Sequence, residues 1–140
     1  MTFEVRTRSL PGRPAAIGSA GACTLVVDRP ADAGGDGHGF NGGQLLHLAV
    51  AGCVSNDLFR EARAAGIVLH RVEVTVHGDF DGDPATSTGI SYDVLVDGDA
   101  PRARLRELVD RVDAIAEIPN SLRRGTAVRL RRAQLVGEPG

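Results

Sequence analysis

The fold is decided by one uninterrupted stretch, FNGGQLLHLAVAGCVSNDLFREARAAG, which spans residues 40–66. Asn41 belongs to the residue types that cap helix N-termini, and Phe40 before it is placed to act as a hydrophobic staple. Gly66 supplies the usual signal for a helix C-terminus. The stretch therefore predicts one long helix that begins at Asn41 and ends at Gly66.

The first half of this helix, residues 45–54, is apolar on nearly every side, whereas residues 56–63 are amphipathic. A helix that is apolar all round is expected to be buried on all its faces. A chain of 140 residues seldom encloses such a helix by itself. We therefore expect a second copy of the chain to cover part of it, in a homodimer.

Strand patterns lie on both sides of the central helix. Alternating or β-rich segments predict strands at residues 2–9, 22–28, 72–77, 90–96 and 126–135. The first two belong to a small antiparallel meander, and the next two form a hairpin. Residues 101–116 have apolar side chains at helical spacing and predict a second, amphipathic helix that Pro119 ends. This order of elements is typical of an α+β fold, and residues 1–140 are expected to form one domain.

The composition excludes several classes of function. The formal net charge is −2, so no electrostatic footprint for nucleic acid or an anionic membrane is present. All 16 basic residues are arginine, which excludes a catalytic lysine. Two cysteines are too few for a disulfide scaffold. With neither a secretory signal nor an apolar run long enough to span a membrane, we expect a cytoplasmic protein.

Cys53 is the central candidate for chemistry. A mid-helix cysteine is more often a small, inert core residue. Cys53 lies about three turns from the helix N-terminus, beyond the reach of the helix dipole, so a reactive thiol there requires a cation from elsewhere in the chain. His47 lies on a different helix face and is a poor base for it. Asp57 shares the face of Cys53 and is either a solvated acid or a partner for an arginine.

Two loop motifs favour structural roles. Residues 37–42 match G-x-G-x-x-G, but no strand directly precedes them, so we interpret them as a loop rather than a dinucleotide site. The acids at 79, 81 and 83 imitate the start of a calcium loop. Ile90 stands at its twelfth position and Pro84 interrupts it, so this segment is predicted to be a hairpin turn. No metal and no cofactor are expected.

A basic cluster lies near the C-terminus. Its members are Arg123, Arg124, Arg129, Arg131 and Arg132. Binding of RNA by such a cluster usually uses stacking aromatic side chains, and the whole chain has four Phe, one Tyr and no Trp. We therefore interpret the cluster as an exposed strand face paired with acids, and expect no nucleic-acid partner.

Four segments, taken in order, make a recognisable pattern. They are PGR at 11–13, FNGGQLL to AGC at 40–53, AGI with VEV at 65–67 and 72–74, and IPNS with RG at 118–121 and 124–125. Together they resemble the OsmC/Ohr family of organic hydroperoxide resistance and osmotically induced proteins, over almost the whole chain. The resemblance implies an OsmC-like fold, with antiparallel sheets wrapped around a long central helix in an intertwined homodimer.

The resemblance also implies a reaction and two site residues. Cys53 matches the peroxidatic cysteine, whose thiolate attacks an organic hydroperoxide, and Arg13 matches the arginine that stabilises this thiolate. In the family a second cysteine then closes a disulfide. That position is Ile118 here, and the glutamate that orients the arginine in the Ohr branch is Gly43. Cys23, on an early strand, is a poor substitute for the missing thiol.

These departures leave two functions open. The first is a one-cysteine thiol peroxidase for organic hydroperoxides in oxidative-stress defence, in which an external thiol reductant regenerates Cys53. The alternative is a catalytically degenerate member that binds a small apolar or acyl ligand at the dimer interface. Asp57 is a candidate to hold Arg13 in place of the missing glutamate.

Overall fold

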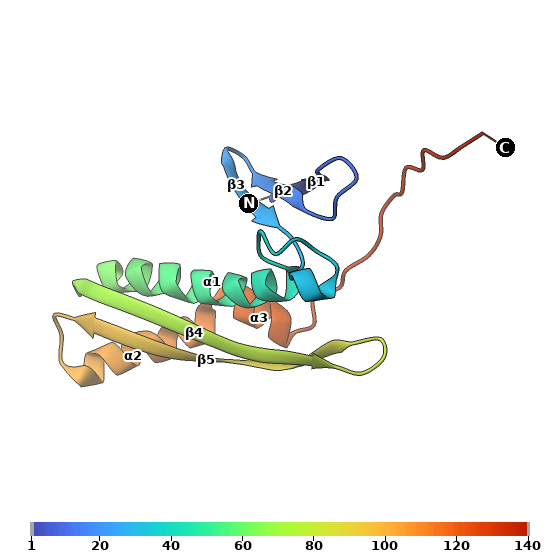
Figure 1. Ribbon diagram of the computed structural model, residues 1–140. Helices are drawn as coiled ribbons and strands as arrows, with labels where there is room; N and C mark the ends of the chain where they lie inside the picture. The colour runs from blue at the N-terminus through green and yellow to red at the C-terminus, as the bar shows by residue number, and fades with distance from the viewer. Residues whose placement is uncertain (1, 140) are drawn as a thin grey trace.

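Helix α1 (Gly42–Ala64) runs through the middle of the computed structural model, which describes residues 2–139 (Figure 1). A small three-stranded sheet lies on one side of α1, and a long β-hairpin lies on the other. Two shorter helices follow the hairpin, and the chain ends in an extended arm that leaves the body of the molecule. This arrangement is the α+β architecture that the sequence predicts.

Both ends of α1 follow from its sequence. The Asn41 side chain accepts a hydrogen bond from the Gln44 amide at 2.8 Å, and the Gln44 side chain accepts one from the Asn41 amide at 2.9 Å. This reciprocal pair is a capping box. Gly66 follows the helix with φ of 69°, in the left-handed region that favours glycine. The predicted helix and its cap are therefore confirmed.

The N-terminal sheet consists of β1 (Arg6–Ser9), β2 (Ala16–Ala20) and β3 (Cys23–Val27). The strands pair antiparallel in the order β1-β2-β3, which confirms the predicted meander. A loop that contains the short 3₁₀ helix η1 (Ala31–Ala33) then leads into α1. The first three strands are thus connected to the central helix by one segment, residues 28–40.

The core lies between α1, the hairpin and α2 (Arg102–Ile115). Strands β4 (Leu69–Asp81) and β5 (Thr86–Gly98) pair antiparallel and place alternate side chains on one face. Val74 and Val94 are partners on that face, and both pack against the buried core cluster. The members of this cluster are Val54, Leu58, Ala62, Ile67, Leu108, Val112 and Ala116. Apolar burial between one hairpin face and two helices therefore stabilises the body.

Helix α3 (Glu117–Arg123) differs from the prediction that Pro119 ends the second helix. Helix α2 ends at Ile115, and the extended backbone of Ala116 (ψ of 124°) separates it from α3. Pro119 lies in the first turn of α3, where its missing N–H has no helical partner to lose. The proline is therefore compatible with a new helix instead of marking only the end of the previous one.

The predicted strand at residues 126–135 is wrong for this structure. The chain has no regular secondary structure there, and Val128 and Leu130 are 93% and 84% exposed. Alternating side chains describe a strand's two faces, but a strand forms only where a neighbouring edge supplies hydrogen-bond partners. The arm finds no such edge among residues 2–139. The expected strand face of arginines and acids is therefore absent as well.

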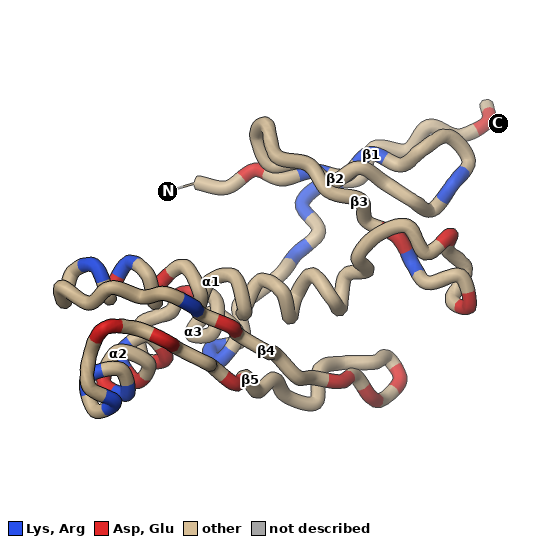
Figure 2. The backbone as a smooth tube through the Cα atoms, turned by 60° about the vertical axis from the view of Figure 1, so that its left-hand side comes forward, with Lys and Arg blue, Asp and Glu red and all other residues tan. Residues whose placement is uncertain are grey.

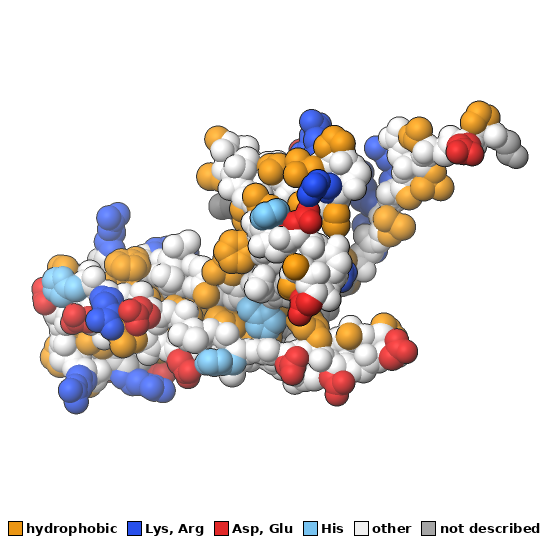
Figure 3. Space-filling view, viewed as in Figure 1, with side chains coloured by type: hydrophobic (Ala, Val, Ile, Leu, Met, Phe, Trp, Pro, Cys, Tyr) orange, Lys and Arg blue, Asp and Glu red, His pale blue; other side chains and the backbone are white. Residues whose placement is uncertain are grey.

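Much apolar surface stays exposed in the single chain. Leu48 and Phe59 on α1 are each 48% exposed, so the chain alone does not bury its central helix on every side. Figure 3 shows further hydrophobic side chains on the N-terminal sheet and along the C-terminal arm. No helix within residues 2–139 combines the length and the apolarity that crossing a membrane demands.

Candidate functional site

Cys53 lies on the face of α1 that is turned toward the core. It is a free cysteine, half-buried, and it packs against the buried cluster beside Val54. Val50 precedes it by three residues and Leu46 by seven, so the three side chains follow one stripe of the helix. Any ligand of this stripe therefore lies within one or two helical turns of the Cys53 sulfur.

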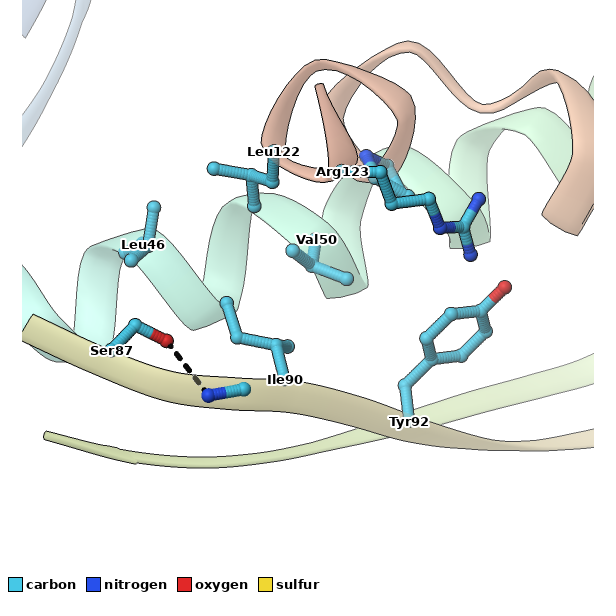
Figure 4. A pocket seen from close by; sticks show the side chains of 9 residues that line it. Leu46, Val50, Ser87, Ile90, Tyr92, Leu122 and Arg123 are labelled. Atoms are coloured by element: carbon cyan, nitrogen blue, oxygen red, sulfur yellow. Dashed lines mark hydrogen bonds between the residues drawn. The ribbon is translucent and has the colours of Figure 1, made fainter. Parts of the chain in front are cut away.

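An apolar pocket of about 270 Å³ opens on this stripe, between α1, β5 and α3 (Figure 4). Leu46 and Val50 form its α1 wall, and Ile90 and Leu122 face them from β5 and α3. The remaining lining residues are Ser87, Gly89, Tyr92, Pro119 and Arg123. Cys53 is not a lining residue; it follows Val50 by one turn along the same face. Mostly aliphatic walls with a few polar groups suit a small apolar ligand.

A hydrogen-bonded network closes one end of the pocket. The Tyr92 hydroxyl donates to the Asp113 carboxylate, and Arg123 Nη2 donates to the same carboxylate at 2.7 Å. Burial, together with the Asp113 carboxylate, raises the pKa of Tyr92 to about 12. The hydrogen bond from Tyr92, followed by that from Arg123, lowers the pKa of Asp113. At neutral pH the network therefore holds a neutral phenol, a carboxylate and a guanidinium, and it ties α3 to α2 and β5.

Arg13 lies in the turn between β1 and β2 and is largely exposed. Its guanidinium forms an ion pair with Asp36, with an Nη1–Oδ2 distance of 2.8 Å. Within residues 2–139 no hydrogen bond joins Arg13 to Cys53, and the guanidinium is paired with Asp36.

Within one chain, Asp57 is not the partner of Arg13. Its carboxylate is buried and pairs with Arg60 of the same helix, with an Nη1–Oδ1 distance of 3.2 Å. Residues three apart face each other on a helix, so the local partner is reached at little cost. Within one chain Asp36 contacts Arg13. The expectation that Asp57 replaces the missing glutamate is therefore not met inside a single subunit, and for an Arg13 supplied by a second subunit it stays a prediction.

His47 turns away from Cys53, as its helical position predicts. Its Nδ1 contacts the Gly43 carbonyl oxygen at 2.5 Å, so Nδ1 carries the proton, and its ring packs edge-on against Phe80 with centroids 6.0 Å apart. Phe80 also occupies the space beside Gly43, because a Cβ there would lie 3.1 Å from the Phe80 ring. A larger side chain at position 43 would have to displace that ring.

The structure brings forward three groups that the sequence did not predict: Asp36, and the pair of Tyr92 and Asp113. Asp36 and Arg13 are 23 residues apart, and Tyr92 and Asp113 are 21 residues apart. Pairs at such separations leave no periodic signal in a single sequence. The one available sign was that Tyr92 is the only tyrosine of the chain and lies on the inward face of a predicted strand.

The remaining motifs behave as the sequence indicates. Residues 37–41 lie in the loop before α1, and Gly42 is the first residue of the helix. Asp79 and Asp81 lie at the end of β4 and Asp83 in the hairpin turn, where Asp81 accepts a hydrogen bond from the Gly82 amide. Among the described residues no group of three or more metal-ligating side chains converges.

Comparisons with known proteins agree with this fold. The family model described as OsmC-like protein matches residues 35–131. No curated protein sequence matches the chain. Similar solved structures include an OsmC-like protein from Mycoplasma pneumoniae, with a TM-score of 0.75 and 16% identity over 90% of this chain and 89% of that one.

Two further solved structures are named for hydroperoxide resistance. An organic hydroperoxide resistance protein OsmC from Legionella pneumophila has a TM-score of 0.68 and 20% identity, over 88% of this chain and 90% of that one. The organic hydroperoxide resistance protein OhrB of Bacillus subtilis has a TM-score of 0.60 and 23% identity, over 90% and 93% of the two chains. At these identities the likeness establishes the shared fold.

Proposed function

Because this chain belongs to the OsmC-like protein family, we propose that it is a one-cysteine thiol peroxidase that reduces organic hydroperoxides. One observation carries the proposal: Cys53 lies one turn beyond Val50, on the stripe of α1 that walls an apolar pocket of about 270 Å³. The pocket offers a place for the organic part of the substrate on the helix face that carries a free thiol one turn further along. The names of the Legionella pneumophila and Bacillus subtilis proteins support the same substrate class.

The reaction uses Cys53 as its nucleophile. The thiolate attacks the terminal oxygen of the hydroperoxide, the O–O bond breaks, and its electron pair leaves with the alkoxide, which takes up a proton to become an alcohol. Sulfur is oxidised to sulfenic acid while the peroxide is reduced. Arg13 stabilises the thiolate and the departing negative charge.

Ile118 determines how the cycle closes. With isoleucine in place of a second cysteine, the sulfenic acid reacts with an external thiol, which forms a mixed disulfide and releases water. A second external thiol then releases Cys53 as a thiol and leaves as a disulfide. The cytoplasm, where such thiols are kept reduced, is the compartment that suits this cycle.

A homodimer completes the site in this proposal. The single chain leaves Leu48 and Phe59 of α1 half-exposed, and no hydrogen bond joins Arg13 to Cys53 within residues 2–139. A second copy that covers α1 buries Leu48 and Phe59. It also brings its own Arg13, on the β1–β2 turn, to the face of α1 that carries Cys53.

The test follows the oxygen atom. After one equivalent of an alkyl hydroperoxide, intact mass and peptide mapping should find one added oxygen on Cys53, together with one equivalent of alcohol. Cys53→Ser should abolish peroxide consumption, and Cys23→Ser should retain it, which makes the second variant the matched control. Oxidation at Cys23 alone, with Cys53 untouched, rejects the mechanism.

A second candidate function is binding of a small apolar or acyl ligand without turnover. The mainly aliphatic pocket and the loss of a thiol at position 118 favour it. Acyl compounds should then raise the melting temperature, whereas Leu122→Phe, which fills the pocket from its half-exposed α3 wall, should remove that shift. Stabilisation by acyl compounds combined with no oxidation of Cys53 selects this candidate over the peroxidase.

A further inference from the structure

The loop between β3 and α1 is organised around one buried carboxylate. Asp28 is 3% exposed, and its oxygens accept hydrogen bonds from the amides of Arg29 at 2.8 Å, Asp36 at 3.2 Å and His38 at 3.0 Å. These bonds, led by that from the His38 amide, lower the pKa of Asp28. A charged Asp28 therefore fixes the loop backbone at the amide of Asp36 and at the amide of His38, two residues later.

The same loop is closely packed where it closes. A Cβ on Gly35 would lie 2.1 Å from the Arg29 carbonyl oxygen, and one on Gly39 would lie 2.2 Å from that of Val26. Backbone hydrogen bonds secure the far end: the Asp28 amide donates to the Phe40 carbonyl at 3.0 Å, and the Phe40 amide donates to the Val26 carbonyl at 3.1 Å. The direction in which the Asp36 side chain leaves the backbone is thus set by contacts on both sides.

The Asp36 carboxylate is directed at Arg13. Its Oδ2 lies 2.8 Å from Arg13 Nη1, across two segments that are 23 residues apart. Arg13 itself sits in a closed turn, because its amide donates to the Leu10 carbonyl at 3.1 Å and the Leu10 amide donates to Ala15 at 2.9 Å. Figure 2 shows this β1–β2 turn lying over the loop that leads into α1.

The side chains of Arg13 and Asp36 are 60% and 37% exposed. Exposed ion pairs contribute little to folding stability. Asp28 anchors the loop that carries Asp36, whereas the Asp36 carboxylate itself forms an exposed ion pair. The Asp36–Arg13 pair is therefore better explained by what it does to the arginine than by what it adds to the stability of the fold.

We propose that Asp36 is a positioning residue that orients the Arg13 guanidinium for the Cys53 thiolate, and this inference rests on the proposed peroxidase function. Asp36 touches neither thiol nor substrate; it acts by restricting the rotamers of Arg13. The pair is formed within one chain, so each subunit of a dimer presents an arginine that is already oriented before the partner arrives.

Removing the Asp36 carboxylate has opposite effects on the Cys53 thiolate depending on whether Asp36 orients Arg13 or acts only through its own charge. Removing a carboxylate near the site, with Arg13 left in place, would favour the Cys53 thiolate, because a like charge is lost. Removing a carboxylate that orients Arg13 has the opposite effect, because the arginine leaves its place. The two explanations therefore predict shifts in opposite directions.

The experiment measures the pH profile of Cys53 alkylation by iodoacetamide in the full-length protein, in a Cys23→Ser background. Arg13→Ala should move the midpoint of the profile up by about one pH unit. Asp36→Asn should move it up by a similar amount and should add nothing when combined with Arg13→Ala. Asp36→Glu should restore most of the parent profile.

Asp32→Asn is the matched control. It removes the same charge from the same loop, and residues 2–139 show no ion pair for Asp32. This variant should leave the midpoint within about 0.2 pH units of the parent, which is the scale expected of one distant, screened charge. Circular dichroism and melting temperature should be unchanged for both loop variants, since the exposed pair carries little stability.

Two results overturn the inference. If Arg13→Ala raises the midpoint and slows peroxide consumption while Asp36→Asn leaves or lowers the midpoint, Asp36 does not position Arg13 and the peroxidase proposal stands. If Arg13→Ala changes neither quantity, the role of Arg13 in the proposed function fails, and the positioning role fails with it.

Discussion

Tyr92 on β5 donates its hydroxyl hydrogen bond to the carboxylate of Asp113 on α2, at the end of the apolar pocket. Arg123 on α3 binds the same carboxylate, at 2.7 Å. Three consecutive elements of the chain thus share one anion. The wall of the pocket depends on this link, because α3 carries Pro119 and Leu122.

Tyr92→Phe should lower the free energy of unfolding by about 1–2 kcal/mol, because a half-buried hydrogen bond to a carboxylate is lost. Denaturant unfolding at neutral pH measures the change. Because the pKa of Tyr92 is raised to about 12, the parent's advantage is present below the ordinary tyrosine value near 10 and is lost as pH rises toward 12. Asp110→Asn, which breaks an exposed pair with Arg106 on the same helix, is the control and should change stability by less than about 0.5 kcal/mol. Equal effects of the two variants would contradict the link.

Asp28→Asn should destabilise the protein at neutral pH, since an amide cannot replace a carboxylate that accepts from three backbone amides. The pKa of Asp28 is lowered from 3.8, so its contribution is present above that value and is lost as pH falls through the lower, folded value. Denaturant unfolding as a function of pH should show a constant difference between parent and variant above about pH 5, and a shrinking one below about pH 4. A difference that grows on acidification would argue against the carboxylate as the anchor of the loop.

Ile118→Cys should change the product of oxidation. In the parent, one equivalent of hydroperoxide should add an oxygen to Cys53. In the variant, the sulfenic acid should condense with the new thiol at the start of α3, so that the mass falls by two hydrogens and the free-thiol count drops. Ile115→Cys, at the end of α2, is the control and should show only the added oxygen. Oxygen retained on Cys53 in both variants would mean that the two positions lie too far apart for a bridge.

Leu48→Arg should convert a dimer into a monomer. Leu48 is 48% exposed on α1, so a charged side chain is tolerated in the subunit but not against a second apolar surface. Light scattering at micromolar concentration measures the mass, and circular dichroism checks that the subunit stays folded. Glu107→Arg, on the exposed surface of α2, should leave the mass unchanged. A parent protein that is already monomeric would remove the basis of the shared site.

Local sequence determined the elements whose signals lie within a few residues. The helix from Gly42 to Ala64 forms where Asn41 and Gln44 cap each other and where Gly66 adopts a positive φ. Alternation of apolar residues placed the hairpin of β4 and β5, because the side-chain period of a strand is written directly in the sequence. For the central helix and the hairpin, the local sequence pattern alone is therefore enough to predict the element.

Two local signals misled. Pro119 looks like a helix end but lies in the first turn of α3, because the chain reorients at Ala116 before it. Residues 126–135 alternate as a strand does, yet no edge within the described chain pairs with them. Whether such a segment becomes a strand depends on a partner that alternation alone does not specify.

Tertiary structure alone decided which charged groups meet. Within one chain Arg13 pairs with Asp36 rather than Asp57, because the loop around Asp28 brings Asp36 to the β1–β2 turn while Asp57 pairs with Arg60 one turn along its own helix. The identity of a nucleophile such as Cys53 is legible in one helix. Which charged groups pair with one another depends on how loops tens of residues apart close. Many carboxylates have the right charge, and only the folded geometry selects one of them.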